Sequence, residues 1–136
     1  MIYLKELITN GESHFRLFRT KFKKAKTKAG KEVFPQSALK GFGDPYLSSN
    51  GDYLIFTGYD PKQWGSTCDL YLAFWKGKNW GKPIKLSNIN SAGPDFSPTV
   101  SPDGIWLYYR KNYVFMKVPF EPIYRGCLEK MLVENE

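Results

Sequence analysis

Residues 44–56 read Asp44-Pro-Tyr-Leu-Ser-Ser-Asn-Gly-Asp-Tyr-Leu-Ile-Phe56, and residues 97–109 read Ser97-Pro-Thr-Val-Ser-Pro-Asp-Gly-Ile-Trp-Leu-Tyr-Tyr109. The two stretches align at an offset of 53 residues, with proline, serine, glycine and leucine at matching positions. Each contains Asn-Gly or Asp-Gly, a pair that favours a tight hairpin turn because Gly and Asn adopt positive φ at low cost. A run of β-forming residues follows each turn. We therefore predict that each stretch forms two antiparallel strands.

The segment after the first turn adds two more strands. A loop over residues 58–67 leads to the apolar run Asp69–Trp75, and a second turn leads to Lys82–Leu86. Four short strands joined by turns make up one unit, which we assign to residues 44–91. This unit is expected to be the complete one.

The second unit, residues 92–136, is shorter. Its third strand is expected over Tyr113–Val118, and Pro119 and Pro122 are expected to stop the regular structure. The tail is expected to form a short helix, because apolar residues recur there at helical spacing. They are Leu128, Met131 and Leu132.

Upstream of the first turn the repeat is weaker. Residues 1–43 are interpreted as a degenerate or partial unit, with strands expected over Phe15–Arg19 and Val33–Leu39. A basic run joins these two strands as a hairpin loop. The whole chain is therefore expected to be one repeat domain.

The motifs resemble the repeats of the WD40-like β-propeller family of the TolB type. Ser101-Pro-Asp-Gly104 and Leu107-Tyr-Tyr109 match the turn and strand of that repeat, and Asp69-Leu-Tyr71 matches the next strand. Trp80-Gly-Lys-Pro83 and Asn88-Ile-Asn-Ser91 match the segment that joins one repeat to the next. The resemblance implies an all-β fold of propeller-like blades, each with four antiparallel strands.

The chain departs from that pattern in two places. Ser49-Asn50 stands where Pro-Asp is usual, and the second unit lacks the long loop and the Asp-hydrophobic-Tyr element. A closed ring needs at least about 4 blades of roughly 40 to 45 residues, more than the 136 residues present. We therefore expect an incomplete, open array that binds a protein partner or self-associates as a dimer or larger assembly.

Composition is that of a packed domain, with 42% hydrophobic and 17% aromatic residues. No apolar stretch approaches the roughly 20 residues that span a bilayer. The start lacks the features of a signal peptide, so a cytoplasmic location is expected as the sequence stands, or a periplasmic or extracellular one if a leader is missing. Cys68 and Cys127 are expected to be buried apolar residues rather than a disulfide.

The net charge of +7 arises mainly from the acid-free run between Arg16 and Lys31. One interpretation is a solvated loop. The other is a patch that contacts nucleic-acid phosphates, with Phe18 and Phe22 available to stack on bases. The candidate polyanion-binding residues are Arg16, Arg19, Lys21, Lys23, Lys24, Lys26 and Lys28.

The sequence contains no recognisable catalytic motif. His14 is the only histidine, and no nucleophile elbow, phosphate-binding loop or zinc ligand set accompanies it. We therefore expect no catalytic residue, no metal and no cofactor. Four aspartates near repeat positions are expected to satisfy backbone N–H groups at turns or strand starts. They are Asp44, Asp69, Asp95 and Asp103.

Two tryptophans beside glycine, Trp64 and Trp80, are candidates for binding a ligand or partner. The alternative is that they cover the apolar edge of a blade. The expected function is a non-catalytic propeller scaffold that binds a protein or ligand. Two alternatives stay open: a polyanion binder acting through residues 16–31, and a truncated accessory propeller of a hydrolase or peptidase.

Overall fold

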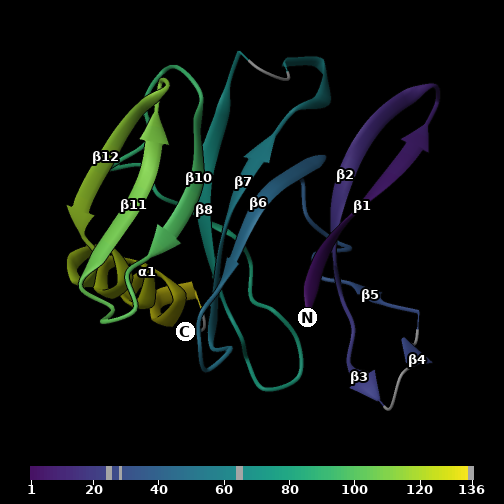
Figure 1. The fold of residues 1–136 in the computed structure, drawn as a ribbon, viewed down its shortest axis with the longest axis horizontal. Helices are drawn as coiled ribbons and strands as arrows, with labels where there is room; N and C mark the ends of the chain where they lie inside the picture. The colour runs from purple at the N-terminus through teal and green to yellow at the C-terminus, as the bar shows by residue number, and fades with distance from the viewer. Residues whose placement is uncertain (24–25, 28, 64–65, 135–136) are drawn as a thin grey trace.

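The computed structural model describes residues 1–23, 26–27, 29–63 and 66–134. Three antiparallel β-sheets lie side by side, and one C-terminal helix lies across the lower end of the sheet nearest the C-terminus (Figure 1). In the described part of the chain the array is open. The predicted all-β class is therefore confirmed, together with the short C-terminal helix.

The middle sheet contains the four strands that the first repeat unit predicts. In spatial and chain order they are β6 (Gly41–Leu47), β7 (Tyr53–Tyr59), β8 (Cys68–Phe74) and β9 (Ile84–Lys85). A short 3₁₀ helix, η1 (Pro61–Gln63), follows β7. This sheet lies between the other two, so both of its faces are covered (Figure 1).

The C-terminal sheet has three strands, as the shorter second unit predicts. They are β10 (Asp95–Val100), β11 (Trp106–Lys111) and β12 (Val114–Pro119), with β11 in the centre. Strand β10 packs against β6, β7 and β8 of the middle sheet. Strand β12 pairs only with β11 among the described strands, so one of its edges is open.

The N-terminal sheet has the order β1-β2-β5. Strands β1 (Ile2–Thr9) and β2 (Glu12–Arg19) form a long hairpin, and β5 (Lys31–Glu32) pairs with the end of β2. The strand expected over Val33–Leu39 is not formed, because the chain turns away after Glu32 and its carbonyls bind Arg16 instead of a strand. Strand β1 was not predicted from the sequence.

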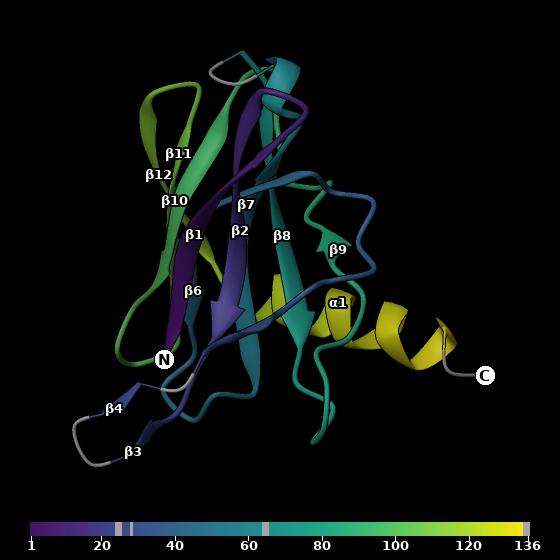
Figure 2. The same ribbon diagram turned by 90° about the vertical axis from the view of Figure 1, so that its right-hand side faces the viewer.

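The basic run forms a small ribbon that extends away from the three sheets (Figures 1 and 2). Its strands are β3 (Phe22–Lys23) and β4 (Lys26–Thr27), which pair antiparallel. This agrees with the hairpin interpretation of the run.

The two repeat turns have the same local geometry. Gly51 and Gly104 have φ of 76° and 75°, and each donates its N–H to a serine carbonyl three residues earlier. The serine hydroxyl then accepts backbone N–H groups across the turn: Ser48 accepts those of Asp52 and Tyr53, and Ser101 accepts that of Trp106. This shared network explains why serine occurs at both positions.

Two hydrophobic cores fill the spaces between the sheets. One lies between the middle and N-terminal sheets and contains Leu17, Phe42 and Phe56. The other lies between the middle and C-terminal sheets and contains Ile55, Leu72 and Leu107.

The C-terminal helix closes the lower end of the second core. Helix α1 (Glu121–Glu134) buries Cys127 against this core, and Tyr124 packs edge-on to Phe74. The prediction that Pro122 stops regular structure was wrong: it lies in the first turn of α1, where a missing N–H costs little. No helix of the described residues has the length and apolar character needed to cross a bilayer.

Candidate binding surface on the C-terminal sheet

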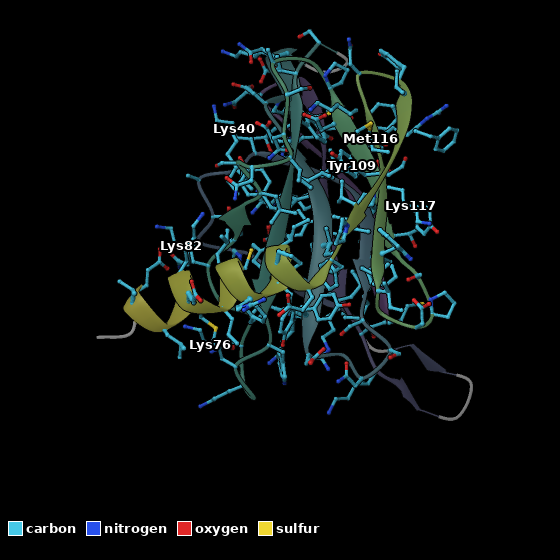
Figure 3. All side chains as sticks on the ribbon, turned by 90° about the vertical axis from the view of Figure 1, so that its left-hand side faces the viewer. Lys40, Lys76, Lys82, Tyr109, Met116 and Lys117 are labelled. Carbon is cyan, nitrogen blue, oxygen red and sulfur yellow. The ribbon has the colours of Figure 1, made fainter. Side chains whose placement is uncertain are left out.

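The C-terminal sheet has one covered face and one uncovered face. Side chains alternate along each strand, so Leu107 and Tyr109 of β11 point into the core while Trp106, Tyr108 and Arg110 point outward. Figure 3 shows Tyr109 and Met116 directed into the molecule and Lys117 directed away from it. We define the aromatic–cationic face as Phe96, Trp106, Tyr108, Arg110, Tyr113, Phe115 and Lys117.

The centre of this face is a row across three strands. Arg110 of β11 is paired directly with Phe96 of β10 on one side and with Phe115 of β12 on the other. The guanidinium carbon lies 5.8 Å from the Phe96 ring centroid and 4.5 Å from that of Phe115. Both distances are in the range of cation–π attraction, so the two rings fix the position of the charge.

The Arg110 side chain has an unmet hydrogen-bonding group. Its Nε atom is buried and has no hydrogen-bond partner in the described structure. A buried N–H without an acceptor costs free energy, and the cost is larger for a charged group. The two rings therefore hold a guanidinium that stays charged at any physiological pH.

A second row lies next to the first. Tyr108 of β11 is paired with Lys117 of β12, and the Lys117 Nζ atom lies 4.0 Å from the centroid of the Trp106 ring. Aromatic surface remains accessible on both strands, because Tyr108 is 38% exposed and Phe115 is 77% exposed. The face thus offers open rings and cations side by side.

Tyr113 extends the face at the tip of the β11–β12 hairpin. The two turn residues, Asn112 and Tyr113, have φ of 47° and 68°, as a two-residue hairpin turn requires. Tyr113 is 62% exposed and its ring lies edge-on to Phe96, with centroids 5.6 Å apart. Positive φ is unfavourable for a bulky residue, and glycine is the usual choice at this turn position.

The cations of this face have no carboxylate partner within the described residues. The ion pairs found there join Arg16 to Glu32, Lys85 to Asp69 and Arg125 to Glu121. Asp103 is near Lys117, but its carboxylate accepts hydrogen bonds from the Ser101 hydroxyl and the Ile105 N–H. These bonds, with a smaller effect of Lys117, lower the pKa of Asp103. The Asp103 carboxylate is therefore already hydrogen-bonded within its own turn.

Of the two tryptophans singled out from the sequence, the structure describes only Trp80. Trp64 lies outside the described residues. Trp80 is half-buried, bridges to Trp75 and packs edge-on to its ring at 5.4 Å. Arg19 lies 4.2 Å above the Trp75 ring, so this region is built by packing within the fold.

The candidate polyanion residues have different surroundings. The Arg16 guanidinium forms an ion pair with Glu32 and donates to the carbonyl oxygens of Leu39 and Phe34, at 2.7 and 2.8 Å. Lys21 is exposed. Lys23 and Lys26 are paired on the ribbon, and only their backbone is described. Lys24 and Lys28 lie outside the described residues.

Most of the repeat aspartates bind backbone N–H groups, as predicted. Asp44, Asp95 and Asp103 accept N–H groups from Ser97, Ser91 and Ile105, respectively. Asp69 instead pairs with Lys85 at 2.9 Å. No group of three metal-ligating side chains comes together among the described residues.

The cysteines are buried and free, which confirms the prediction that they behave as apolar residues. Burial raises the pKa of each thiol to about 11, so both are protonated near neutral pH. Cys68 borders a pocket of about 190 Å³ with Tyr59, Asp60 and Tyr71. This volume is below the roughly 300 Å³ of ordinary small-molecule sites.

Comparison with protein-family models, curated proteins and solved structures finds no match to this chain.

Sequence reasoning missed the aromatic–cationic face, although the alternation of Trp106, Tyr108 and Arg110 was visible. Alternation shows which residues share a face, but only the packing of the sheets shows which face stays uncovered.

Proposed function

We propose that this protein is a non-catalytic binding module, an open array of TolB-like propeller blades that holds a macromolecular partner on the aromatic–cationic face. The observation that carries the proposal is the position of Arg110, whose guanidinium is fixed between the rings of Phe96 and Phe115. Because the two rings already hold this side chain in place, binding a partner costs little additional side-chain entropy.

The composition of the face supports the same function. Tryptophan, tyrosine and arginine are the residues most enriched among those that dominate binding energy at interfaces. Here Trp106, Tyr108 and Arg110 occupy alternate positions of one central strand. A contiguous aromatic surface of this kind on a folded domain indicates an interaction site.

The fold itself does not require these exposed side chains. The second core is filled from the opposite face of the same sheet by Val100, Leu107 and Tyr109. Removing outward aromatic groups should therefore leave the core intact.

A photo-crosslinking amino acid tests the proposal. We expect benzoylphenylalanine at position 108 to form covalent adducts with a macromolecule in the native host, because Tyr108 lies at the centre of the face. The matched control carries the same group at Leu132, which is 56% exposed near the C-terminal end of α1, and this end of the helix extends away from β11 and β12 (Figure 2). Adducts at position 132 with none at position 108 would contradict the proposal.

A further inference from the structure

We infer that the partner of the aromatic–cationic face is a single-stranded nucleic acid, whose bases stack on Tyr108 and Phe115 and whose phosphates contact Arg110 and Lys117. The inference deepens the proposed function and rests on it.

The geometry of the sheet fits stacked bases. Tyr108 of β11 pairs with Lys117 of β12, and Phe115 lies two residues before Lys117 on the same side of β12. Tyr108 and Phe115 are therefore diagonal neighbours, about 7 to 8 Å apart. Phe115 lies on the neighbouring strand, so the rings form a platform rather than a line. Antiparallel sheets with exposed aromatic residues bind two or three unstacked bases in this way.

The charges favour phosphates as the groups that complete the site. Arg110 and Lys117 lie among the rings, and neither forms an ion pair with a described residue. A phosphate supplies several acceptor oxygens and a planar guanidinium binds it well. Stacking rings with interleaved cations are the combination that single-strand binding uses.

The same charges argue against a second copy of the chain as the occupant. The sheet–sheet contact that β10 makes with the middle sheet is lined by apolar residues such as Ile55, Leu70 and Leu72. A blade of a second copy stacked on the aromatic–cationic face would bury two unpaired cations, which is strongly unfavourable.

Tyr113 provides an independent indication. A tyrosine at φ 68° is a poor solution for hairpin stability, since Asn-Gly is the preferred sequence at such a turn. Strained backbone persists where a side chain is needed for function. The ring of Tyr113 stands at the edge of the platform beside Phe96, where a further base can contact it.

Fluorescence anisotropy with a labelled oligothymidylate or oligouridylate of about 12 nucleotides tests the inference. We expect Tyr108→Ala and Phe115→Ser each to weaken binding by between about 5-fold and about 100-fold, the range for losing one stacked base. Circular dichroism and thermal melting verify that each variant is folded. A duplex of the same sequence should bind more weakly, because its bases are already stacked.

The salt dependence identifies the phosphate contacts. For a single strand, each neutralised phosphate contributes about 0.7 to the slope of log K against log salt. We expect Arg110→Gln and Lys117→Gln each to reduce the magnitude of that slope by about 0.7. The charge-matched control is Lys82→Gln, an exposed lysine on the opposite side of the view in Figure 3.

Tyr113→Gly separates a binding role from a structural one. The Asn-Gly turn should raise the melting temperature by a few degrees, because the strain at position 113 disappears. Nucleic-acid binding should nevertheless weaken by several-fold. A variant that is more stable and binds as tightly as the original chain would show that Tyr113 is not a contact.

Two results would overturn the inference. One is an absence of oligonucleotide binding; if position 108 then crosslinks to a protein, the proposed function stands without it. The other is binding that survives every substitution on the face and is lost when five lysines of the basic run become glutamine, which would assign the site to residues 16–31. Those lysines are Lys21, Lys23, Lys24, Lys26 and Lys28.

Discussion

Asp44 accepts a hydrogen bond from the backbone N–H of Ser97, the residue that occupies its own position in the next repeat unit, with an N–O distance of 3.0 Å. Both residues precede a proline, and both have positive φ, 43° and 53°. Both also lie in β-bulges, between Gly43 and Tyr46 in β6 and at the corresponding place in β10. Equivalent points of neighbouring sheets are thus bonded directly to each other.

Substitutions at Asp44 should separate the contribution of the hydrogen bond to stability from the contribution of the positive φ. Asp44→Ala loses the bond and places alanine at positive φ, so we expect the free energy of unfolding to fall by about 2 kcal/mol. Asp44→Asn retains an acceptor oxygen and tolerates the conformation, so its cost should be below about 0.5 kcal/mol. Urea denaturation measures both values. Equal destabilisation by the two variants would contradict the assigned bond.

The two repeat turns should respond equally to alanine. Gly51→Ala and Gly104→Ala each place a Cβ in open space, so the cost comes from positive φ alone, about 1 kcal/mol for each variant. Gly126→Ala is the matched control, because its Cβ also meets open space but lies within α1. It should stabilise the fold by about 0.5 to 1 kcal/mol. Thermal melting of the three variants is the measurement, and unequal costs at the two turns would contradict their structural equivalence.

The Asn90 side chain forms hydrogen bonds with the backbone of β8 in the middle sheet. Its amide accepts the Leu70 N–H at 2.8 Å and donates to the Leu70 carbonyl at 3.1 Å. Asn90→Ala removes both bonds and should lower the free energy of unfolding by about 1 to 3 kcal/mol. Asn88→Ala, at an exposed position of the same segment, should change it by less than about 0.5 kcal/mol. A similar effect of both substitutions in chemical denaturation would exclude this role for Asn90.

The buried thiols should make the fold sensitive to alkaline pH. Burial raises the pKa of Cys68 and Cys127 from 9.0 to about 11. The folded state therefore retains these protons after the unfolded chain has lost them, so stability present below pH 9 is lost as the pH rises toward 11. Replacing both cysteines by alanine should reduce this loss by on the order of 2 kcal/mol per thiol. Denaturation curves between pH 8 and pH 11 measure how steeply the free energy of unfolding falls with pH. Burial also raises the pKa of Tyr59 and Tyr71, so these residues contribute to the pH dependence that remains in the variant.

Local sequence determined the turns and most strands correctly. The positive φ of Gly51 and Gly104 follows from short-range geometry, which is the same in a peptide and in a folded domain. Strand β1 was missed although the Asn10-Gly11 turn after it has the same chemistry. Its mixture of apolar and charged residues reflects a strand of which large parts remain exposed.

The candidate surface was harder to predict because it depends on contacts between distant segments. Trp80 was a candidate binding residue from its place beside glycine, and the structure shows that it packs on Trp75. Arg16 was a candidate phosphate contact from its place in the basic run, and the structure shows its guanidinium bound to Glu32 and two carbonyl groups. Only the position of β10 against the middle sheet determines that Tyr108 faces outward.

The bond between Asp44 and Ser97 gives the segment from residue 44 to residue 96 a property of its own. Its first residue, Asp44, supplies the acceptor of the hydrogen bond that joins the two sheets. The residue directly after its last, Ser97, supplies the donor of that bond, which we call the joint. Tandem duplication of this segment would place a copied Asp44 at the position that Ser97 now has relative to the first Asp44. The N–H of the copied residue could donate to the first Asp44 carboxylate. Its own carboxylate could accept the N–H of Ser97. The chain can therefore grow by one sheet at a time with the same hydrogen bond repeated at each joint. A gene carrying such a duplication should yield a folded protein with a longer array, detectable as an increased strand signal in circular dichroism and cooperative melting; an insert that remains unfolded would show that the joint alone is not sufficient.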